Sequence, residues 1–496
     1  MNDLLPFGAG AWLFIGVYLG SLILVGWIGY RARRENTLAD FYLAGSSFGF
    51  VVLFLTLYAT QYSGNTFFGY TGKTYRIGYA WVMAVHFMTA IIVCYLIFAP
   101  KLYRLSRHLH FITPTDFLAH RYGSSALNLL ATMIMVVVLA NFLLAQLMAM
   151  GRAMQGLAVN DPVQAYNYGV ILLTTIMVIY GTLGGIRAVA WTDAIQGAVL
   201  MTGFLILLFI LHRMYGPVSE ATQVIHTSAD ALTRAKVAPP DANRLREWLS
   251  YVLLVGLAGS LYPQAIQRVF AARNARVLRH SLALMAFIPL TTTLIAVFAG
   301  IYAIAYFPGL QGAASDQILT RMLAEVQLHS LPGYWLVVVL FAAALSAMMS
   351  TADSALLSIS SMLSKDIYGV FIHRRAGQAV LTRVGKLSSW VLVIFLVWLA
   401  IYLRDKASLI QLLDRKFDLM IQLVPAFMLG IHWQGLKPGP VLTGIVAGII
   451  VALLLAYGDI TAVVDGKLYG FHPGLYGLLV NLALACGLSL RATHQT

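Results

Sequence analysis

Apolar stretches long enough to cross a lipid bilayer recur along the whole chain, separated by short polar segments. A membrane-spanning helix needs about 20 mainly apolar residues, and we find thirteen such stretches in the 496 residues. We predict spans at 8–31, 47–72, 79–103, 124–152, 166–183, 189–213, 248–271, 278–307, 334–367, 383–404, 410–433, 439–458 and 471–491. The longest segment between them, 214–247, is too short for a domain and is predicted to be a surface loop. The pattern predicts an all-α polytopic membrane protein in which residues 1–496 form one transmembrane domain.

The composition agrees with this prediction and argues against other classes of protein. Charged residues make up only 10% of the chain, whereas about a quarter of the residues of a soluble protein are charged. The net charge of +14 comes largely from Lys and Arg in short loops, which is typical of anchoring in a lipid bilayer. We therefore expect no nucleic-acid partner. The sequence contains no nucleophile–base pair, metal cluster or phosphate-binding loop that would indicate an enzyme.

The distribution of Lys and Arg among the loops predicts the orientation. If the N-terminus lies outside, the inner segments carry 19 of these residues and the outer segments 14. Because cytoplasmic loops are enriched in Lys and Arg, we expect an outer N-terminus and a cytoplasmic C-terminus in a bacterial inner membrane. The first span lacks a basic region before it, so we expect it to be retained rather than cleaved as a signal peptide.

The ninth predicted span carries hydroxyl groups and a carboxylate in an otherwise apolar segment. Ala347, Ser350, Thr351 and Ser354 follow helical spacing and share one face, and Asp353 lies on a neighbouring stripe. A charge at membrane depth costs several kcal/mol, so it normally faces protein or water. Hard cations prefer oxygen ligands. The segment therefore predicts an ion site.

Two other predicted spans contain residues that interrupt helices. Polar residues cluster around Gly64 and Gly69 in the second span, and Gly256, Gly259 and Pro263 interrupt the seventh. Unwound backbone at membrane depth is tolerated only where it lines protein or water. Interruptions in corresponding spans are typical of transporters built from inverted repeats, with the binding site at the midplane. The alternative is close helix packing through small residues.

Fragments of the chain resemble the sodium:solute symporter family, which includes bacterial proline, sialic acid, pantothenate and galactose symporters. The similar fragments are NTLADFYLAGSS (36–47), ITPTDFLAHRYGS (112–124), GTLGGIRAVAWTDAIQG (181–197), PQAIQRVFAARN (263–274) and the spacing from Ser350-Thr351 to the KDIY motif at 365–368. The resemblance implies a LeuT-type core that works by alternating access. It also implies inverted repeats at 47–213 and 248–433, an extra N-terminal span at 8–31 and two C-terminal spans at 439–491.

The resemblance further implies a sodium site shared by the family. Its ligands are backbone oxygens where the second span unwinds and hydroxyls on the ninth span. The matching positions here are Ala59, Tyr62, Ala347, Ser350 and Thr351.

Some members of the family bind a second sodium near the aspartate of the WTD motif. The matching positions here are Asp193, Ser350, Asp353 and Ser354. Asp353 departs from the family, which commonly has a small or hydroxylated residue there. Either Asp353 strengthens a second sodium site, or it carries a proton and adds proton coupling. The remaining alternative is a structural role, in which Asp353 caps a kink or pairs with an Arg or Lys of a neighbouring helix.

The family builds its solute pocket from the second, third, seventh and eleventh spans. In this chain, the candidate positions are Gln61, Ser63, Asn65, Thr66, His86, Tyr262, Gln264 and Gln422. An intramembrane His is a functional hypothesis, and an interhelical hydrogen bond is the alternative. The second and third spans carry neither an acid for an amine nor a mid-depth cation for a carboxylate. A half-helix N-terminus could still hold a carboxylate.

We therefore expect a secondary active transporter that imports a small polar organic solute together with sodium, as a monomer. The solute class stays open between amino acids, carboxylates and sugar-like compounds. One alternative is a membrane-embedded solute sensor that acts through a partner protein, since only RATHQT follows the last predicted span. Another is a proton-coupled symporter that uses Asp353.

Overall fold

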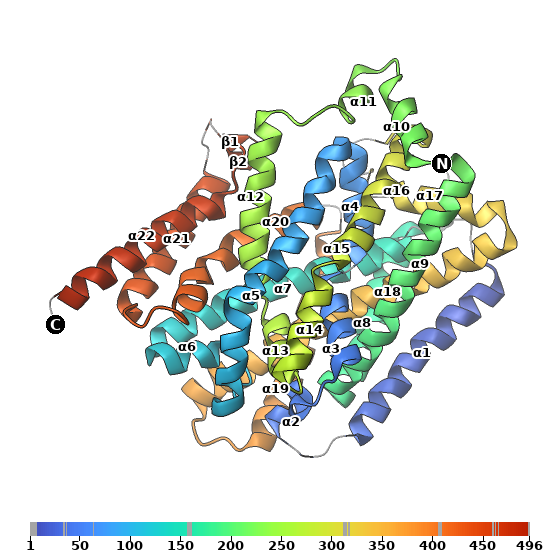
Figure 1. The fold of residues 1–496 in the computed structure, drawn as a ribbon. Helices are drawn as coiled ribbons and strands as arrows, with labels where there is room; N and C mark the ends of the chain where they lie inside the picture. The colour runs from blue at the N-terminus through green and yellow to red at the C-terminus, as the bar shows by residue number, and fades with distance from the viewer. Residues whose placement is uncertain are drawn as a thin grey trace.

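The computed structural model of the chain is almost entirely helical (Figure 1). It describes residues 7–32, 35, 37–62, 64–155, 161–310, 315, 318–404, 409–458, 461, 463–464 and 466–494. Within these ranges, the side chains at 64, 65, 67, 68, 409–414, 464, 493 and 494 are not described.

Long helices and short connecting helices alternate along the first half of the chain. They are α1 (Ala9–Arg31), α2 (Leu38–Leu43), η1 (Ala44–Ser46), α3 (Phe50–Gln61), α4 (Gly64–Ile77), η2 (Gly78–Val82), α5 (Met83–Leu109), α6 (Thr115–Tyr122), α7 (Ser125–Gln155), α8 (Pro162–Gly184), α9 (Ile186–Tyr215), α10 (Val218–His226) and α11 (Ala231–Ala235).

The second half continues in the same way and adds one small hairpin. Its elements are α12 (Ala242–Gly259), α13 (Pro263–Ala271), α14 (Ala275–Met285), α15 (Ile288–Thr291), α16 (Thr293–Tyr306), α17 (Ile318–His329), α18 (Leu331–Ser361), η4 (Met362–Ile372), α19 (Gln378–Tyr402), α20 (Leu409–Met420), η5 (Ile421–Leu423), η6 (Pro425–Leu429), α21 (Pro438–Tyr457), β1 (Val463–Val464), β2 (Lys467–Leu468) and α22 (Pro473–His494).

Ten helical segments of the described chain are long and apolar enough to cross a membrane, and the bent pair α12–α13 makes an eleventh. This count is lower than the thirteen spans that we predicted, because two predicted spans are interrupted. The span at 47–72 is divided into α3 and α4, and the span at 410–433 changes from α20 into the short turns η5 and η6. Pro425 begins η6, and proline cannot donate the N–H that a continuing α-helix requires.

The predicted loop at 214–247 folds against the body of the protein. It contains the short helices α10 and α11. The Tyr79 N–H donates to the Lys236 carbonyl at 2.9 Å, and the Tyr79 and Thr222 hydroxyls lie 2.7 Å apart. The loop is therefore tied to the turn that connects α4 with α5.

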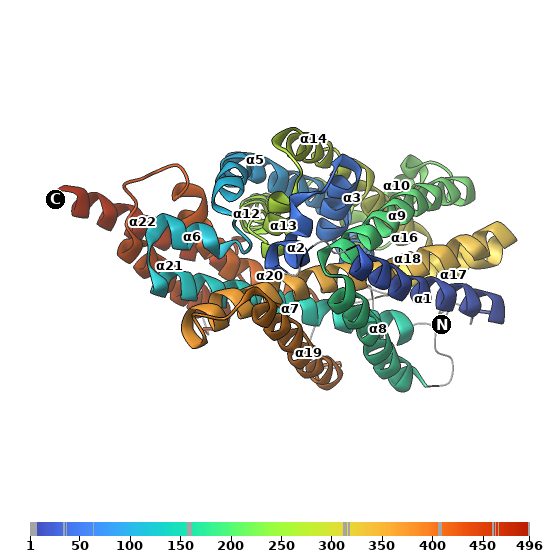
Figure 2. The same ribbon diagram turned by 90° about the horizontal axis from the view of Figure 1, so that it is seen from below.

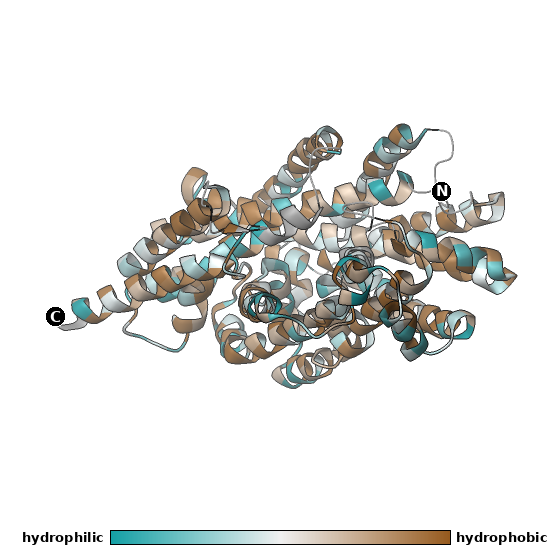
Figure 3. Cartoon of the chain, turned by 90° about the horizontal axis from the view of Figure 1, so that it is seen from above, coloured by the Kyte–Doolittle hydropathy of each residue, from teal (hydrophilic) through white to brown (hydrophobic). Residues whose placement is uncertain are grey.

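Helix α18 lies at the centre of the bundle, while α1 and α19 lie at its edge (Figure 2). In the most apolar window of α18, 83% of the residues are buried, compared with 28% for α1 and for α19. Apolar residues colour much of the outer helices (Figure 3), as expected for surfaces that face lipid. The polar residues of α18 are thus enclosed by protein rather than lipid.

Several fragments that carry the family resemblance contact one another at helix ends. Arg187, at the start of α9, donates to both carboxylate oxygens of Asp40 at 2.6 and 2.9 Å. Asp366 accepts hydrogen bonds from Thr113 at 3.0 Å and from Thr115 at 2.7 Å. These fragments are far apart in the sequence, and their polar contacts hold the ends of α2, α6, α9 and η4 together.

Candidate functional site

The break after α3 leaves backbone carbonyls available at membrane depth. Helix α3 ends at Gln61, and Tyr62 has extended dihedral angles of φ −110° and ψ 101°. The last carbonyls of a helix lack intrahelical partners. The Tyr62 N–H still donates to the Tyr58 carbonyl at 2.9 Å, and the next carbonyl, that of Ala59, accepts a hydrogen bond from another helix.

The Thr351 hydroxyl lies between one of these carbonyls and α18. Its Oγ1 is 3.2 Å from the Ala59 carbonyl oxygen and 2.8 Å from the Ala347 carbonyl oxygen. Thr351, Ala59 and Ala347 are all buried. Three uncharged oxygens of the predicted shared sodium site therefore converge between α3 and α18. Tyr62 lies at the break itself, where its ring stacks on that of Tyr58 at 5.0 Å.

Ser350, the neighbour of Thr351, contacts a different polar group. Its hydroxyl donates to Oδ1 of Asp193 on α9, and Thr56 on α3 donates to Oδ2 of the same carboxylate. Arg268 on α13 completes this cluster, because its Nη2 lies 2.9 Å from Asp193 Oδ2 and 2.6 Å from Ser354 Oγ. Of the residues predicted for a second sodium, Asp193 and Ser354 thus contact a guanidinium, and Ser350 contacts Asp193.

Arg268 is held firmly in this position. It is 1% exposed, and it donates from Nε to Thr56 at 2.7 Å and from Nη1 to the Gln264 carbonyl at 3.0 Å. A buried carboxylate requires a compensating charge, and here a side chain of the protein supplies it.

Asp353 points toward a different helix, α8. It is 1% exposed, and a Cβ at Gly181 of α8 would overlap its carboxylate. Among the described residues, its Oδ2 has no hydrogen-bond partner. The structure therefore brings Asp193, Ser350 and Ser354 together but turns Asp353 toward α8, and each proposed role of Asp353 stays a prediction.

Some candidate solute residues gather at the two helix breaks. Tyr262 and Gln264 lie at the break between α12 and α13 and are buried. Gln61 lies at the end of α3 and donates to the Tyr95 hydroxyl at 3.1 Å. Thr66 is buried in α4. Ser63 and the side chain of Asn65 lie outside the described residues.

The structure does not bring Gln422 and His86 to these breaks. Gln422 Nε2 donates to the carbonyls of Asp418 and Gly474 at 3.1 and 2.9 Å, so the side chain ties η5 to the start of α22. His86 is exposed on α5, and its ring centroid lies 4.9 Å from that of Trp248.

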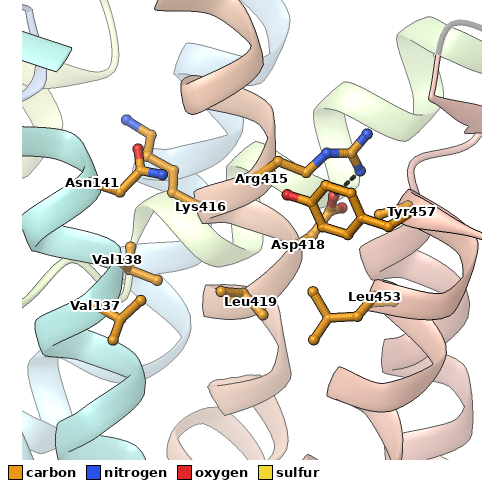
Figure 4. A pocket seen from close by; sticks show the side chains of 11 residues that line it. Val137, Val138, Asn141, Arg415, Lys416, Asp418, Leu419, Leu453 and Tyr457 are labelled. Carbon is orange, nitrogen blue, oxygen red and sulfur yellow. Dashed lines mark hydrogen bonds and ion pairs between the residues drawn. The ribbon is translucent and has the colours of Figure 1, made fainter. Parts of the chain in front are cut away.

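A small cavity lies between α7, α20 and α21 (Figure 4). Its volume is about 120 Å³. Lys416 and Asn141 lie on its α7 side, and Arg415, which is ion-paired with Asp418 at 3.2 Å, lies toward α21 (Figure 4).

Sequence reasoning did not assign a role to Arg268 or Thr56. Arg268 belongs to the fragment 263–274, which we used only for the resemblance. The sequence did contain a signal for Arg268, because it follows a predicted helix break within a predicted span. A charge at membrane depth needs a partner.

The chain resembles known transporters over most of its length. A model of the sodium:solute symporter family matches residues 41–448. The sodium/proline symporter of Staphylococcus aureus (strain JH9) is 25% identical over 488 residues, which cover 95% of this chain and 90% of the relative. The osmoregulated proline transporter OpuE of Bacillus subtilis (strain 168) is 24% identical, with 89% of this chain and 87% of the relative covered.

The fold is shared with solved transporter structures. A Na⁺-coupled sialic acid symporter in a substrate-bound outward-open state superimposes with a TM-score of 0.79 at 20% identity, covering 97% of this chain and 98% of the other. MHP1, a nucleobase-cation-symport-1 family transporter, gives a TM-score of 0.53 at 13% identity, with 94% and 96% covered. The predicted LeuT-type fold is therefore confirmed. The family match over most of the chain shows that this multi-pass membrane protein belongs to the sodium:solute symporter family and performs sodium-coupled solute symport.

Proposed function

We propose that the driving sodium binds between the break after α3 and the middle of α18. Its ligands are the oxygens of Ala59, Ala347 and Thr351, with Tyr62 completing the set. Ser350, which the resemblance also implied for this site, donates to Asp193 instead. The observation that carries this proposal is the Thr351 hydroxyl, which lies within 3.2 Å of the Ala59 carbonyl and 2.8 Å of the Ala347 carbonyl. Oxygen ligands of this kind suit hard cations.

Sodium at this position would couple to the solute through the α3 break. A cation that binds oxygens of both α3 and α18 stabilises the arrangement in which these helices lie together. Gln61, a candidate solute ligand, lies two residues after Ala59 on the same helix end. Sodium binding therefore favours the conformation that binds solute, and by linkage the solute raises the affinity for sodium by the same factor.

We further propose that transport uses a single sodium ion. The carboxylate of Asp193 is the charged group of the predicted second site, and the Arg268 guanidinium already compensates it at 2.9 Å. A second sodium would have to displace Arg268 from Asp193, Ser354 and Thr56, which is unfavourable because it would leave a buried cation without its hydrogen bonds.

The solute is a small polar organic compound, because similar proteins are named as symporters of proline and of sialic acid. We propose inverted repeats at 47–213 and 248–433 that exchange access to one site. The protein would act as a monomer in a bacterial inner membrane with its N-terminus outside, as the Lys and Arg distribution favours.

Uptake in proteoliposomes tests this proposal. The purified protein is reconstituted, and uptake of labelled proline, sialic acid and galactose is measured under an inward sodium gradient and under an equal potassium gradient. We expect at least one of these solutes to accumulate with sodium only, and the Thr351→Val variant to require a higher sodium concentration. Equal accumulation under the two gradients, or a Thr351→Val variant with unchanged sodium dependence, would show that the proposed site is wrong.

A further inference from the structure

Two neighbouring helices, α5 and α14, carry arginines at ends that lie together. The helices lie side by side (Figures 1 and 2). The Tyr103 hydroxyl of α5 donates to the Ala272 carbonyl at 3.3 Å, which joins the last turns of α5 to the segment that leads into α14. The arginines of both helices therefore gather on one part of the surface. This arginine patch consists of Arg104, Arg107, Arg273, Arg276 and Arg279.

The arginine patch has no acidic partner. All five side chains are exposed, and none of them forms an ion pair or a side-chain hydrogen bond within the part of the chain that the structure describes. The segments 97–110 and 271–290 contain neither Asp nor Glu. The buried Arg187 and Arg268, in contrast, are ion-paired. The patch therefore presents positive charge that its own segments do not neutralise.

The exposed surface of α14 changes from basic to apolar along the chain. Leu278 and Leu282 are buried, so they define the face that packs on the protein. Away from that face, Arg276 and Arg279 lie in the first turns of the helix. Exposed apolar residues follow, among them Phe287 where α15 begins.

Helix α5 shows the same change in the opposite direction of the chain. Val93 and Ile97 are exposed and apolar, and Arg104 and Arg107 follow on the same side of the helix, because spacings of three, four and seven residues return to one face. The stretch from Val93 to Arg107 extends about 21 Å along an α-helix. Half of a bilayer, including its headgroups, is about 20–22 Å thick. The surface therefore matches the depth profile of one lipid leaflet.

We propose that the arginine patch binds the phosphate headgroup of an anionic phospholipid, whose acyl chains lie along the apolar surfaces of α5 and α14. A guanidinium binds phosphate through two parallel N–H donors. Each Arg near the membrane surface also attracts anionic lipid. A free phosphate ion would make no use of the exposed apolar residues beside the patch, whereas a phospholipid covers both parts of the surface.

The arginine patch is joined to the helices of the candidate sodium site. The Arg273 N–H donates to the Phe48 carbonyl at 3.0 Å, just before α3. Only residues 272–274 separate α14 from α13, which carries Arg268. A lipid that holds α5 and α14 together is therefore expected to stabilise the folded helix bundle, and this effect does not require solute or sodium.

Titration with two lipids that share their acyl chains tests the inference. The purified protein in a neutral detergent receives dioleoylphosphatidylglycerol or dioleoylphosphatidylcholine, and the thermal unfolding midpoint is measured. Native mass spectrometry counts the bound lipids. A ligand raises the midpoint only if it binds the folded state. We expect phosphatidylglycerol to bind more tightly and to raise the midpoint further, because the phosphatidylcholine headgroup carries its own cation beside the phosphate.

A triple variant assigns this preference to the arginine patch. In Arg107→Gln/Arg273→Gln/Arg276→Gln, we expect the affinity for phosphatidylglycerol to fall about a hundredfold, since each Arg near an anionic surface contributes about fivefold. The midpoint in phosphatidylcholine reports whether the variant is folded. If the triple variant does not fold, Arg276→Gln alone should lower the affinity about fivefold.

A matched control removes the same charge elsewhere. Arg374→Gln/Arg375→Gln/Arg383→Gln alters three exposed arginines of another segment that we predict on the same side of the membrane. We expect this variant to keep the preference for phosphatidylglycerol, because its arginines lie outside the patch.

Three outcomes would overturn the inference. The first is an equal rise of the midpoint with both lipids. The second is an equal loss of the preference in the patch variant and the control variant. The third is a rise with inorganic phosphate as large as that with phosphatidylglycerol, which would indicate a phosphate site without a lipid. None of these measurements uses uptake, so failure of the proposed symport function would leave the inference in place.

Discussion

Neighbouring residues of α18, Thr351 and Ser350, contribute to two polar clusters of opposite character. The Thr351 cluster consists of uncharged oxygens from Thr351, Ala59 and Ala347. The Ser350 cluster contains the carboxylate of Asp193 and the guanidinium of Arg268, which neutralise one another. The first cluster offers oxygen ligands without a cation of its own, and the second already contains one.

This difference indicates which cluster can respond to sodium. A site of neutral oxygens gains a cation without losing an existing charge contact, whereas a bound sodium at Asp193 would compete with Arg268. The same helix can therefore carry one ion-binding face and one structural face. The predictions below alter each face in turn and are ordered by the size of the expected effect.

Removal of the Asp193 carboxylate should cause the largest loss of stability. Asp193→Ala leaves the Arg268 guanidinium buried without its partner, and breaking a buried pair in this way costs about 3–5 kcal/mol. The thermal unfolding midpoint in detergent measures this loss. We expect the double variant Asp193→Ala/Arg268→Met to recover much of it, because no unpaired charge remains. A double variant as unstable as the sum of the two single variants would contradict the structural role of this face.

Removal of the Thr351 hydroxyl should weaken sodium binding without a comparable loss of stability. Thr351→Val keeps the branched shape but removes one oxygen, and we expect the sodium affinity to fall by about tenfold or more, by analogy with hydrogen bonds to charged groups. A sodium titration of the thermal midpoint measures the affinity. Thr175→Val is the control, because the Thr175 hydroxyl also bonds its own helix, at the Ile171 carbonyl 2.7 Å away, but lies on the exposed face of α8. Equal effects of the two variants would remove Thr351 from the sodium site.

A methyl group at Gly181 should disturb the third polar residue of α18. The added Cβ of Gly181→Ala would overlap the Asp353 carboxylate, and overpacking of this kind costs about 1–3 kcal/mol. Gly20→Ala on α1 has no atom within 4 Å of the added Cβ, so we expect it to leave the thermal midpoint unchanged or to raise it slightly. If the two variants have equal midpoints, Asp353 does not face α8.

Substitution of His86 should have the smallest effect. His86 is exposed and lies against Trp248 rather than at a helix break, so we expect His86→Ala to transport solute with an unchanged KM. Gln264→Ala, at the α13 break, should raise KM in the same uptake assay. A raised KM for His86→Ala would show that His86 contributes to solute binding.

The sequence was sufficient to predict the helices and which candidate ligands share one helix face. Hydrophobic periodicity marks apolar helices directly, and Ala347 and Thr351 share a face because helical spacing requires it. The two broken spans were also indicated by Gly, Pro and polar residues, which weaken helices locally. The exact positions differ, because α4 continues through Gly69 and α12 continues through Gly256. The number of continuous spans was predicted too high, because the spans at 47–72 and 410–433 are interrupted. Apolar composition alone does not show whether a helix is continuous.

Contacts between helices could not be predicted in the same way. Arg268, Asp193 and Ser354 lie on three helices, and no local pattern specifies that one guanidinium joins them. The sequence also does not specify how a helix is rotated about its axis. For this reason, it could not show that Asp353 faces α8 or that His86 is exposed.

The number of sodium ions moved with each solute molecule tests the account most directly. In proteoliposomes held at zero membrane potential, the solute gradient at which net solute flux vanishes is measured at a series of sodium gradients. The slope of its logarithm against the logarithm of the sodium gradient gives the ratio. The account predicts one sodium per solute, bound at the Thr351 face, and the same ratio in a Ser354→Ala variant. A ratio of two sodium ions per solute that falls to one in Ser354→Ala would place a transported sodium at the Asp193 face and contradict the account.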